Sequence, residues 1–493
     1  MKKLLLLLPF AFYLLPLQAQ NIGIGTTAPA ISAKLDITST TSGLLVPRMS
    51  TLQRTSIATP AQGLLVYDTD TNTFWFYNAA AWINLSVTAS GGEWSLTGNS
   101  ATNSSTHFLG TTDIQPLRWR VNNTRAGEIH PTNGNVFFGL SSGQANTTGY
   151  QNTANGANAL KLNTSGHVNT AFGNLALASN TTGHFNTAIG GGALSSNTVV
   201  GYNTATGYAA LSSNTVGFEN TANGAFALSS NTTANANIAI GYSALSTQSY
   251  NPGSTWPAGN VAIGHRALFA NQPTSIGNGI KNTAVGTSAL YNNSTGYANT
   301  ATGHSALYSN TTGLNNTANG YGALYSNVAG YNATAIGHNA MFYSNDQTTP
   351  FFNYNVALGY EALYGSDTAS NNTGNYNTAL GYQTLFYNTK GFHNTATGYR
   401  ALISNLTGEY NTATGSAALY FSSTGNYNTA TGYGALYLNS TGEYNTATGY
   451  QTLYKNSTGT YNTAHGSNAL TSNTEGYLNT SVGTDALSGN TIG

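Results

Sequence analysis

The chain has 493 residues, no net formal charge, 6% charged residues, 57 Gly, 32 Tyr and no Cys. The absence of Cys excludes disulfides and thiolate metal sites, and the low charge gives no electrostatic case for nucleic acid or an anionic membrane as a partner. This composition is far from that of an average soluble enzyme.

Residues 1–19 are predicted to be a secretory signal peptide. Met1-Lys2-Lys3 provides a basic start, residues 4–17 form an apolar run, and Ala19 is a small residue before the expected cleavage point. A membrane anchor is the alternative, but the run is shorter than the roughly 20 residues that a spanning helix needs. We therefore expect Sec-dependent export, a location outside the cell or on its outer surface, and no transmembrane segment in the mature chain.

Residues 20–86 predict a small β-meander module. Apolar runs alternate here with polar turn sequences such as Asp-Thr-Asp-Thr-Asn, which is the pattern of short strands joined by turns. The runs lie at residues 43–49, 63–68, 73–77 and 81–85.

Residues 87–134 predict a β-rich connector. Arg118, Arg120 and Arg125 could form a binding patch, but the alternation of Arg and Trp is described more simply by a strand with one solvated face. The apolar runs of the connector lie at residues 93–96, 108–112 and 116–121.

Residues 135–493 are built from copies of Asn-Thr-Ala-x-Gly-x-x-Ala-Leu. The first of nineteen copies begins at Asn152, which is numbered position 1, and most copies begin 17 residues after the previous one. Gly occupies position 5 in every copy. Asn at position 1 is replaced only by Ala333, and Ala at position 3 is replaced only by Ser481. Such regularity means that each position meets the same environment in every copy. Residues 135–139 resemble a degenerate first copy.

The repeat predicts an all-β fold. Seventeen residues cannot hold two helices, and Gly, Asn and Thr in every turn would destabilise them. Two short strands fit, one in Asn-Thr-Ala-x-Gly and one around Ala-Leu-Tyr. Between copies, Asn-x-Thr-Gly, as at residues 180–183, is expected to be a turn in which Gly supplies a positive φ and Asn tolerates it. We predict a parallel β-solenoid of about 20 coils, a rod on the order of 95 Å long.

Four steps between copies are longer, at 22 or 23 residues. Their extra residues always follow the Leu, so we expect loops along one edge of the stack. The insertions lie at residues 246–259, 269–281, 342–354 and 364–376.

Lateral association is expected as well. Ala at position 8 and Leu at position 9 would point to opposite faces of a strand, so one coil would not bury both columns and the aromatic residues of position 10. Packing of chains side by side would bury the remainder, which predicts a homotrimer.

The repeats, for example residues 260–264, Asn-Val-Ala-Ile-Gly, resemble the head repeats of YadA-type trimeric autotransporter adhesins. The resemblance implies a left-handed parallel β-roll, three chains side by side and a surface fibre that binds host matrix or other cells. Residues 43–49, 108–113 and 120–123 resemble modules of secreted, tail-fibre-like proteins of Bacteroidota. Because no β-barrel anchor or terminal chaperone domain is recognisable and residues 490–493 stop in mid-coil, we expect a truncated product.

Tyr residues at positions 6 and 17 form the candidate binding surface. They would make columns one coil apart that grip sugar rings or partner surfaces, or, more simply, stack on one another and stiffen the rod. The candidate ligand-facing residues are Tyr382, Tyr399, Tyr433 and Tyr450 at position 6, and Tyr410, Tyr427, Tyr444 and Tyr461 at position 17.

Other chemistry finds little support. The carboxylates of the solenoid occupy scattered positions and form no recurring acid and base pair, so we expect no enzyme and no cofactor. His167 and His184 share a position in neighbouring coils, but two surface His without a third ligand do not predict a metal site. Thr pairs resemble the arrays of ice-binding proteins over only four consecutive copies, at residues 395–397, 412–414, 429–431 and 446–448.

The predicted function is that of a fibrous, adhesin-like protein. Many equivalent weak contacts along a rod and across three chains would give avidity for cells, matrix proteins or glycans. The alternatives are a phage-like tail-fibre protein and an ice-binding β-solenoid.

Overall fold

The computed structural model describes residues 21–85, 102–103, 105 and 108–493. The predicted signal peptide and the predicted run at residues 93–96 lie outside these residues. The chain divides into two compact units, residues 1–109 and residues 110–493.

The first unit contains two small sheets. β1 (Ile22–Ile24) pairs in parallel with β2 (Leu35–Ile37). In the second sheet, β4 (Leu65–Asp68), β5 (Thr73–Tyr77) and β6 (Trp82–Asn84) form the predicted antiparallel meander.

A short helix that we did not predict joins the remaining strand to this meander. β3 (Arg48–Met49) pairs with β4 in parallel, and α1 (Thr51–Thr55) makes the crossover. The Ser50 hydroxyl accepts a hydrogen bond from the Gln53 N–H, and the Gln53 side chain accepts one from the Ser50 N–H. This capping box is visible in the sequence as Ser-Thr-Leu-Gln.

The second unit begins with an antiparallel hairpin of β7 (Leu117–Val121) and β8 (Thr124–Ile129). Arg118 and Arg120 are exposed on β7, as the alternating pattern predicted. The Arg118 and Arg125 guanidinium groups lie 2.6 and 3.5 Å from the Glu128 carboxylate, and Arg120 donates to Asn123. The three Arg side chains are therefore engaged within the hairpin.

Residues 108–112, which we predicted as a strand, form bends instead. The Thr111 hydroxyl donates to the carbonyl of Gln115, and the Asp113 carboxylate accepts from the Gln115 N–H. These local side-chain bonds offer the backbone an alternative to a strand.

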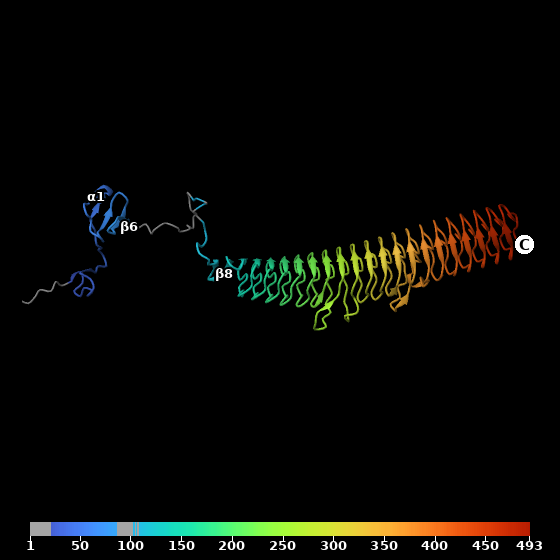
Figure 1. The fold of residues 1–493 in the computed structure, drawn as a ribbon, viewed down its shortest axis with the longest axis horizontal. Helices are drawn as coiled ribbons and strands as arrows, with labels where there is room; N and C mark the ends of the chain where they lie inside the picture. Colours follow the sequence, from blue (N-terminus) through green and yellow to red (C-terminus); the bar gives the residue numbers. More distant parts are fainter. Residues whose placement is uncertain (1–20, 86–101, 104, 106–107) are drawn as a thin grey trace, which may run out of the picture. The chain divides into compact units, whose positions relative to one another are not determined.

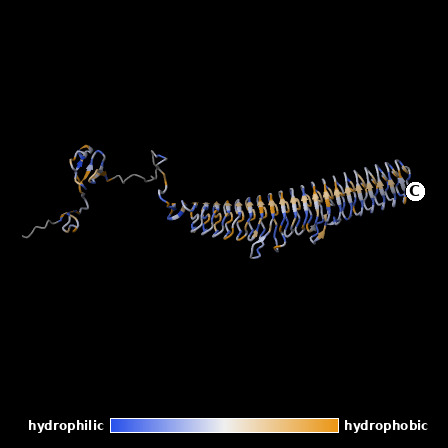
Figure 2. Cartoon of the chain, viewed as in Figure 1, coloured by the Kyte–Doolittle hydropathy of each residue, from blue (hydrophilic) through white to orange (hydrophobic). Residues whose placement is uncertain are grey.

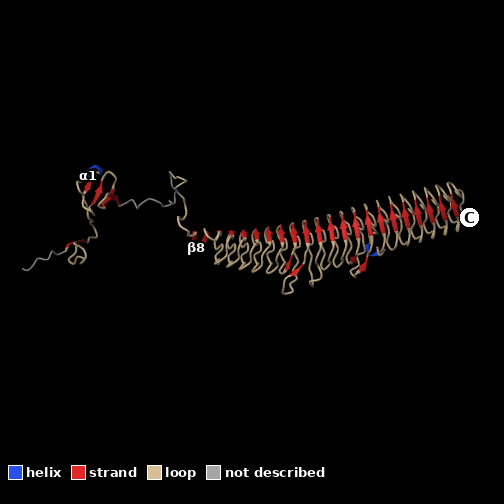
Figure 3. Cartoon of the chain, viewed as in Figure 1, coloured by secondary structure: helices blue, strands red, loops and turns tan. Residues whose placement is uncertain are grey.

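From β9 onward the chain forms a parallel β-solenoid, with one strand from each coil in a single parallel sheet (Figure 1, Figure 3). The strands pair in register, so that Thr395, Ala396 and Thr397 lie beside Thr412, Ala413 and Thr414. The predicted parallel solenoid is therefore confirmed. Its strands are β9 (Val136–Phe138), β10 (Thr153–Asn155), β11 (Thr170–Phe172), β12 (Thr187–Ile189), β13 (Thr204–Thr206), β14 (Thr221–Asn223), β16 (Ile238–Ile240), β18 (Val261–Ile263), β19 (Thr283–Val285), β20 (Thr300–Thr302), β21 (Thr317–Asn319), β23 (Thr334–Ile336), β25 (Val356–Leu358), β26 (Thr378–Leu380), β27 (Thr395–Thr397), β28 (Thr412–Thr414), β29 (Thr429–Thr431), β30 (Thr446–Thr448), β31 (Thr463–His465) and β32 (Thr480–Val482).

The predicted second strand around Ala-Leu-Tyr is wrong. This part of each coil is a series of turns, because the residues at positions 7 and 9 adopt left-handed backbone conformations, with φ of 55° at Ala417 and 50° at Leu419. Neighbouring coils still hydrogen-bond here, as the Leu419 N–H donates to the carbonyl of Ala435 at 2.9 Å. The coil is held by its neighbours without an extended segment.

The same backbone bends correct the prediction about burial. Ala418 at position 8 and Leu419 at position 9 are both fully buried inside the coil, together with Ala413 at position 3. Alternation between faces holds only for extended backbone, and the left-handed Leu turns its side chain inward beside the Ala. Apolar residues consequently recur at the same place in successive coils (Figure 2). The interior therefore gives no reason of its own for lateral association.

The two recurring Gly positions of the repeat are subject to different steric constraints. Gly398 at position 5 has φ of 129°, and a Cβ there would lie 2.6 Å from the carbonyl oxygen of Gly415 in the next coil. In the segment Asn-x-Thr-Gly, neither Asn180 nor Gly183 has a positive φ, so the predicted turn mechanism is wrong. Gly183 leaves room for the Asn180 side chain and the carbonyl of the next coil, both of which a Cβ would meet.

Two columns of buried Asn join the coils. At position 1, the Asn411 N–H donates to the Asn394 side-chain oxygen at 2.9 Å, and the same bond recurs along the rod. At position 12, the Asn405 side-chain amide donates to the Asn388 side-chain oxygen at 2.7 Å. Within one coil, the amides of Asn394 and Asn405 both donate to the carbonyl of Gly408. Each Asn therefore closes its own coil and bonds a neighbour.

The insertions protrude from one edge of the rod, as predicted (Figure 1). They add two short parallel pairs beside the main sheet and one helical turn. The elements are β15 (Ala234–Asn235) with β17 (Trp256–Pro257), β22 (Gly330–Tyr331) with β24 (Phe351–Phe352), and η1 (Ala369–Asn371).

The Asn column at position 12 has a defect that gives a test of its contribution. Ser422 replaces Asn there, is fully buried, and leaves its own hydroxyl and the Asn405 side-chain oxygen without a partner. The Asn439 amide correspondingly lacks the coil-to-coil bond and donates only to Gly442.

We predict that Ser422→Asn raises the free energy of unfolding by about 1–3 kcal/mol, because it restores two buried amide hydrogen bonds. The measurement is the guanidinium unfolding midpoint followed by circular dichroism. Ser467→Asn is the matched control, since it adds the same side chain at position 6, where Asn174 stands naturally. An equal effect of the two substitutions would contradict a specific contribution of the column.

Candidate binding surface

The outward side chains of the solenoid include four columns on and beside the main sheet. In the coil of β27, Thr395 faces outward, His393 and Tyr399 are exposed, and Asn394 and Ala396 are buried. Positions 17 and 6 border the strand at the bends before and after it, and positions 2 and 4 lie on the strand. The register repeats this arrangement in each coil, so each position becomes a column along the rod.

From Tyr354 to Tyr461 the column at position 17 is an unbroken stack of aromatic rings. Successive ring centroids are 4.8–5.0 Å apart, and the rings of Tyr410 and Tyr427 are within 2° of parallel. The stack contains Tyr354, Tyr376, His393, Tyr410, Tyr427, Tyr444 and Tyr461.

The column at position 6 is stacked in the same way but is interrupted. Ring centroids are 5.1–5.3 Å apart in the longest stack, which contains His304, Tyr321, His338, Tyr360, Tyr382 and Tyr399. Ser416 follows Tyr399 at position 6, and the stack resumes with Tyr433 and Tyr450 at 5.4 Å.

The structure thus places the eight predicted Tyr residues in two columns that border the sheet, and the rings pack on one another. Because each interior ring covers the faces of its neighbours, it presents only its edge and its hydroxyl to solvent. Ring faces are accessible only where a stack ends. Contact of these residues with a ligand stays a prediction.

The hydroxyls of the columns influence one another. Burial, followed by the neighbouring hydroxyls of Tyr427 and Tyr461 and the Glu443 carboxylate, raises the pKa of Tyr444 above its ordinary value. Tyr444 therefore remains uncharged and keeps its O–H donor at neutral pH.

A third aromatic column lies at position 10, on the turns that follow the buried Leu. Its rings are half-buried and stacked, with Tyr291, Tyr308 and Tyr325 each 5.1 Å from the next. Burial, together with nearby Tyr residues, raises the pKa of Tyr325. Stacking along the rod covers part of the apolar surface that we expected a neighbouring chain to bury.

The Thr pairs form an ordered array of limited length. In β27 to β30 the Thr residues of positions 2 and 4 lie in register over four successive strands. Ice binding by this array stays a prediction.

His167 and His184 lie in adjacent coils with their rings stacked 4.9 Å apart, and Tyr150 stacks on His167. Within the described residues, no three His, Cys, Asp or Glu side chains are grouped so as to hold a metal ion.

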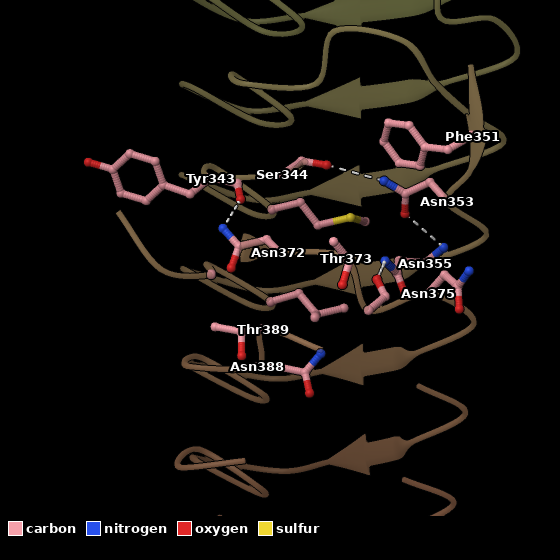
Figure 4. A pocket seen from close by; sticks show the side chains of 14 residues that line it. Tyr343, Ser344, Phe351, Asn353, Asn355, Asn372, Thr373, Asn375, Asn388 and Thr389 are labelled. Atoms are coloured by element: carbon pink, nitrogen blue, oxygen red, sulfur yellow. Dashed lines mark hydrogen bonds between the residues drawn. The ribbon is translucent and has the colours of Figure 1, made fainter. Parts of the chain in front are cut away.

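A cavity beneath two insertions lies where both Asn columns change (Figure 4). Ala333 lacks the position-1 amide, and the Asn355 N–H donates instead to the Asn353 side chain at 3.2 Å. The Asn353 amide also donates to the hydroxyl of Ser344, which replaces Asn at position 12. The cavity measures about 20 Å³, room for about one water molecule. The cavity therefore belongs to the region where Asn353 makes hydrogen bonds in place of the interrupted Asn columns, and it is too small for an organic ligand.

In the N-terminal unit, a buried ion pair supports the four-stranded sheet. The Arg54 Nε lies 2.9 Å from the Asp68 carboxylate, and its guanidinium packs 3.8 Å from the Trp75 ring centroid. Burial raises the pKa of Asp68, but hydrogen bonds from Arg54, Thr51 and the backbone N–H groups of Thr71 and Asp70 outweigh it and lower this pKa to about 2.

The sequence comparisons identify one region. Residues 23–103 match the model of a phage tail-like trimerisation region, which spans the four-stranded sheet and α1. This match agrees with the resemblance of the N-terminal stretches to tail-fibre-like modules, whereas the resemblance of the repeats to YadA-type heads stays a prediction. No curated protein and no solved structure matches the chain.

The matched region and the solenoid rod together fit a fibre-like protein. Across the part of the chain that the structure describes, no helix has the length and apolar character needed to cross a bilayer.

We predict that acid destabilises the four-stranded sheet as the pH falls from 4 to 2. The pKa of Asp68 is lower in the folded state than its ordinary value of 3.8, so the stabilising charge is fully present above pH 4 and is lost as the pH falls through the folded value. Peptide-resolved hydrogen exchange, corrected for intrinsic rates, should show protection of β4 and β5 falling across this window.

Asp68→Asn should lose protection already at neutral pH and show no further change between pH 4 and 2. Solenoid peptides of the same sample are the internal control. A pH dependence that survives Asp68→Asn would assign the acid sensitivity to another group.

Proposed function

We propose that this protein is an exported, non-enzymatic adhesin that works as a trimeric fibre outside the cell or on its outer surface. The solenoid acts as a stiff rod whose outward columns contact cells, matrix proteins or glycans. The N-terminal unit holds three chains together.

The repeated columns are the observation that carries the binding role. Seven stacked rings at position 17 give a regular array of ring edges and hydroxyl donors, and Thr side chains lie beside them. Such an array offers many equivalent weak contacts in place of a single pocket, and three chains multiply them. The small proportion of charged residues favours a partner recognised by hydrogen bonds and apolar contact.

Trimer formation is supported by the match of residues 23–103 to a phage tail-like trimerisation region. The same unit exposes large apolar side chains at Leu44, Leu45 and Leu52, with exposed fractions of 64%, 71% and 74%. Neighbouring exposed apolar residues of this kind mark surfaces that associate. Leu44 and Leu45 line a hollow together with Tyr67 and Phe74, into which a second chain would pack.

A role as a tail-fibre component is the second candidate, and the same family match favours it. The two roles share a trimeric rod with a binding surface and differ in the particle that carries the rod. Ice binding rests on four Thr pairs alone, and thermal hysteresis of the purified protein would bring it forward.

We predict that residues 20–493 bind glycans or matrix proteins on arrays, and that the position-17 column contributes to this binding. Replacing Tyr410, Tyr427, Tyr444 and Tyr461 together by Asn should weaken array binding at least about tenfold, since a multivalent contact is lost. Asn fits this backbone, because Asn315 and Asn332 occupy position 17 with φ of 56° and 61°.

The matched control replaces Tyr420, Tyr437 and Tyr454 at position 10 by Ser, which stands there naturally at Ser195, Ser212 and Ser229. This variant should bind like the parent. No binding of the parent to any array would refute the adhesin proposal.

We predict that the protein has the mass of three chains in multi-angle light scattering and that Leu45→Asp shifts it to monomer. A buried carboxylate at an apolar interface costs several kcal/mol unless it is paired. Val199→Asp, at another exposed apolar residue, which lies on the solenoid, should remain trimeric. A monodisperse monomer for the parent chain would contradict the trimer.

A further inference from the structure

The break in the position-6 column leaves a ring-sized space between two aromatic faces. Tyr399 ends one stack and Tyr433 begins the next, and only the short side chain of Ser416 stands between them. Two coil spacings amount to about 9.5 Å. This is close to twice the 5.3 Å that separates stacked rings within the column, so one further ring at the level of Ser416 would stack on both.

The neighbours at position 7 leave this space open. Ala417 and Gly434 carry no side chain long enough to enter it. Tyr399 stacks on Tyr382, and Tyr433 stacks on Tyr450. Among the described residues no ring packs on the other face of either, so each ring that borders the break has one face without a ring partner.

The chain itself fills an equivalent break elsewhere in the column. Ala225 stands at position 6 between Tyr208 and Tyr242, and the ring of Phe226 packs edge-on between them, with centroid distances of 5.4 and 6.0 Å and interplanar angles of 82° and 86°. A break of this width therefore accommodates a ring between two Tyr residues of the column. At Ser416 the residue that corresponds to Phe226 is Ala417, and within the described part of the chain no ring packs on both Tyr399 and Tyr433.

A positive charge lies beside the Tyr399 ring, on the side of the preceding coil. The Arg400 Nε donates to the Gln383 side chain at 2.9 Å, and its guanidinium lies 5.1 Å from the Tyr399 ring centroid and 5.9 Å from that of Tyr382. Gln383 in turn donates to Glu361, but none of the ion pairs within the described residues involves Arg400. The terminal guanidinium nitrogens are suited to bidentate contact with a carboxylate.

These features indicate which class of ligand would fit the break at Ser416. A pyranose ring presents C–H groups on its two faces, which suit the negative faces of aromatic rings, and polar substituents around its edge. The edge groups would meet the Tyr hydroxyls and Ser416. A purely apolar ring would leave these polar groups without partners, and a carboxylate on the sugar would pair with Arg400 once its guanidinium turns from Gln383 toward the break.

We propose that the break at Ser416 binds one pyranose unit of a glycan, with preference for a uronic acid whose carboxylate contacts Arg400. The inference rests on the proposed binding role of the rod and names the ligand class. In a trimer the site occurs three times at one level of the fibre, so a chain with several uronic acids would bind by avidity.

The test uses the full mature chain with two probes, an oligosaccharide ending in glucuronic acid and its counterpart ending in glucose, in titrations followed by ligand-observed NMR. The parent should bind the acidic probe more tightly. Ser416→Tyr completes the column and should abolish binding of both probes. Ser467→Tyr adds the same ring after Tyr450, leaves the break open and should bind like the parent.

Arg400→Gln should weaken binding of the acidic probe about tenfold, through loss of a charge-assisted pair, and change the neutral probe less than about twofold. Unchanged binding by Ser416→Tyr, or no binding of either probe to the parent at millimolar concentration, would overturn the site. Array binding by the parent together with unchanged probe binding by Ser416→Tyr would overturn the site and leave the adhesin role standing.

Discussion

The fold depends on amide hydrogen bonds between coils, made by two buried columns of Asn. One coil is unstable by itself, because residues such as Tyr410, Ala417 and Leu419 hold left-handed conformations that cost about 1–3 kcal/mol each. Such conformations persist only when the surroundings fix them, and the next coil does so through Asn394, Asn411 and the backbone bonds around them. Stability is therefore a property of neighbouring pairs of coils, as in other solenoids.

Because the columns keep every coil in register, a preference at one outward position becomes a continuous feature of the surface. Tyr at position 17 yields a stack whose ring faces are mutually covered, and the same residue beside a gap yields an open ring face. In the proposed binding role, the interruptions of the columns matter as much as the residues that form them. The sites that differ chemically from the rest are the places where one repeat departs from the others.

The period, the strand, the Gly at position 5 and the edge of the insertions could be predicted because a repeat imposes one environment on each position. The second strand was wrong, and so was the prediction that Ala at position 8 and Leu at position 9 point to opposite faces. Alternation assumes an extended backbone, and the left-handed φ at Leu419 is imposed by contacts between coils. The Asn columns were not predicted. The signal was present, because Asn recurs at positions 1 and 12 in most copies and a turn alone does not require one residue type so consistently. The Tyr columns followed from spacing, but the open faces beside Ser416 depend on which residue each neighbouring coil carries.

The strict register of β27 to β30 has a consequence for how such a rod changes over generations. An in-frame duplication or deletion of one repeat with Asn at positions 1 and 12 inserts or removes a coil whose contacts on both sides are the same as before, so it creates no new core and leaves no buried amide without a partner. Each event moves the tip by about 4.8 Å and adds or subtracts one rung of every column. A change in the number of repeats thus alters the stability of each coil little, whereas the length of the rod and the number of equivalent outward positions change together.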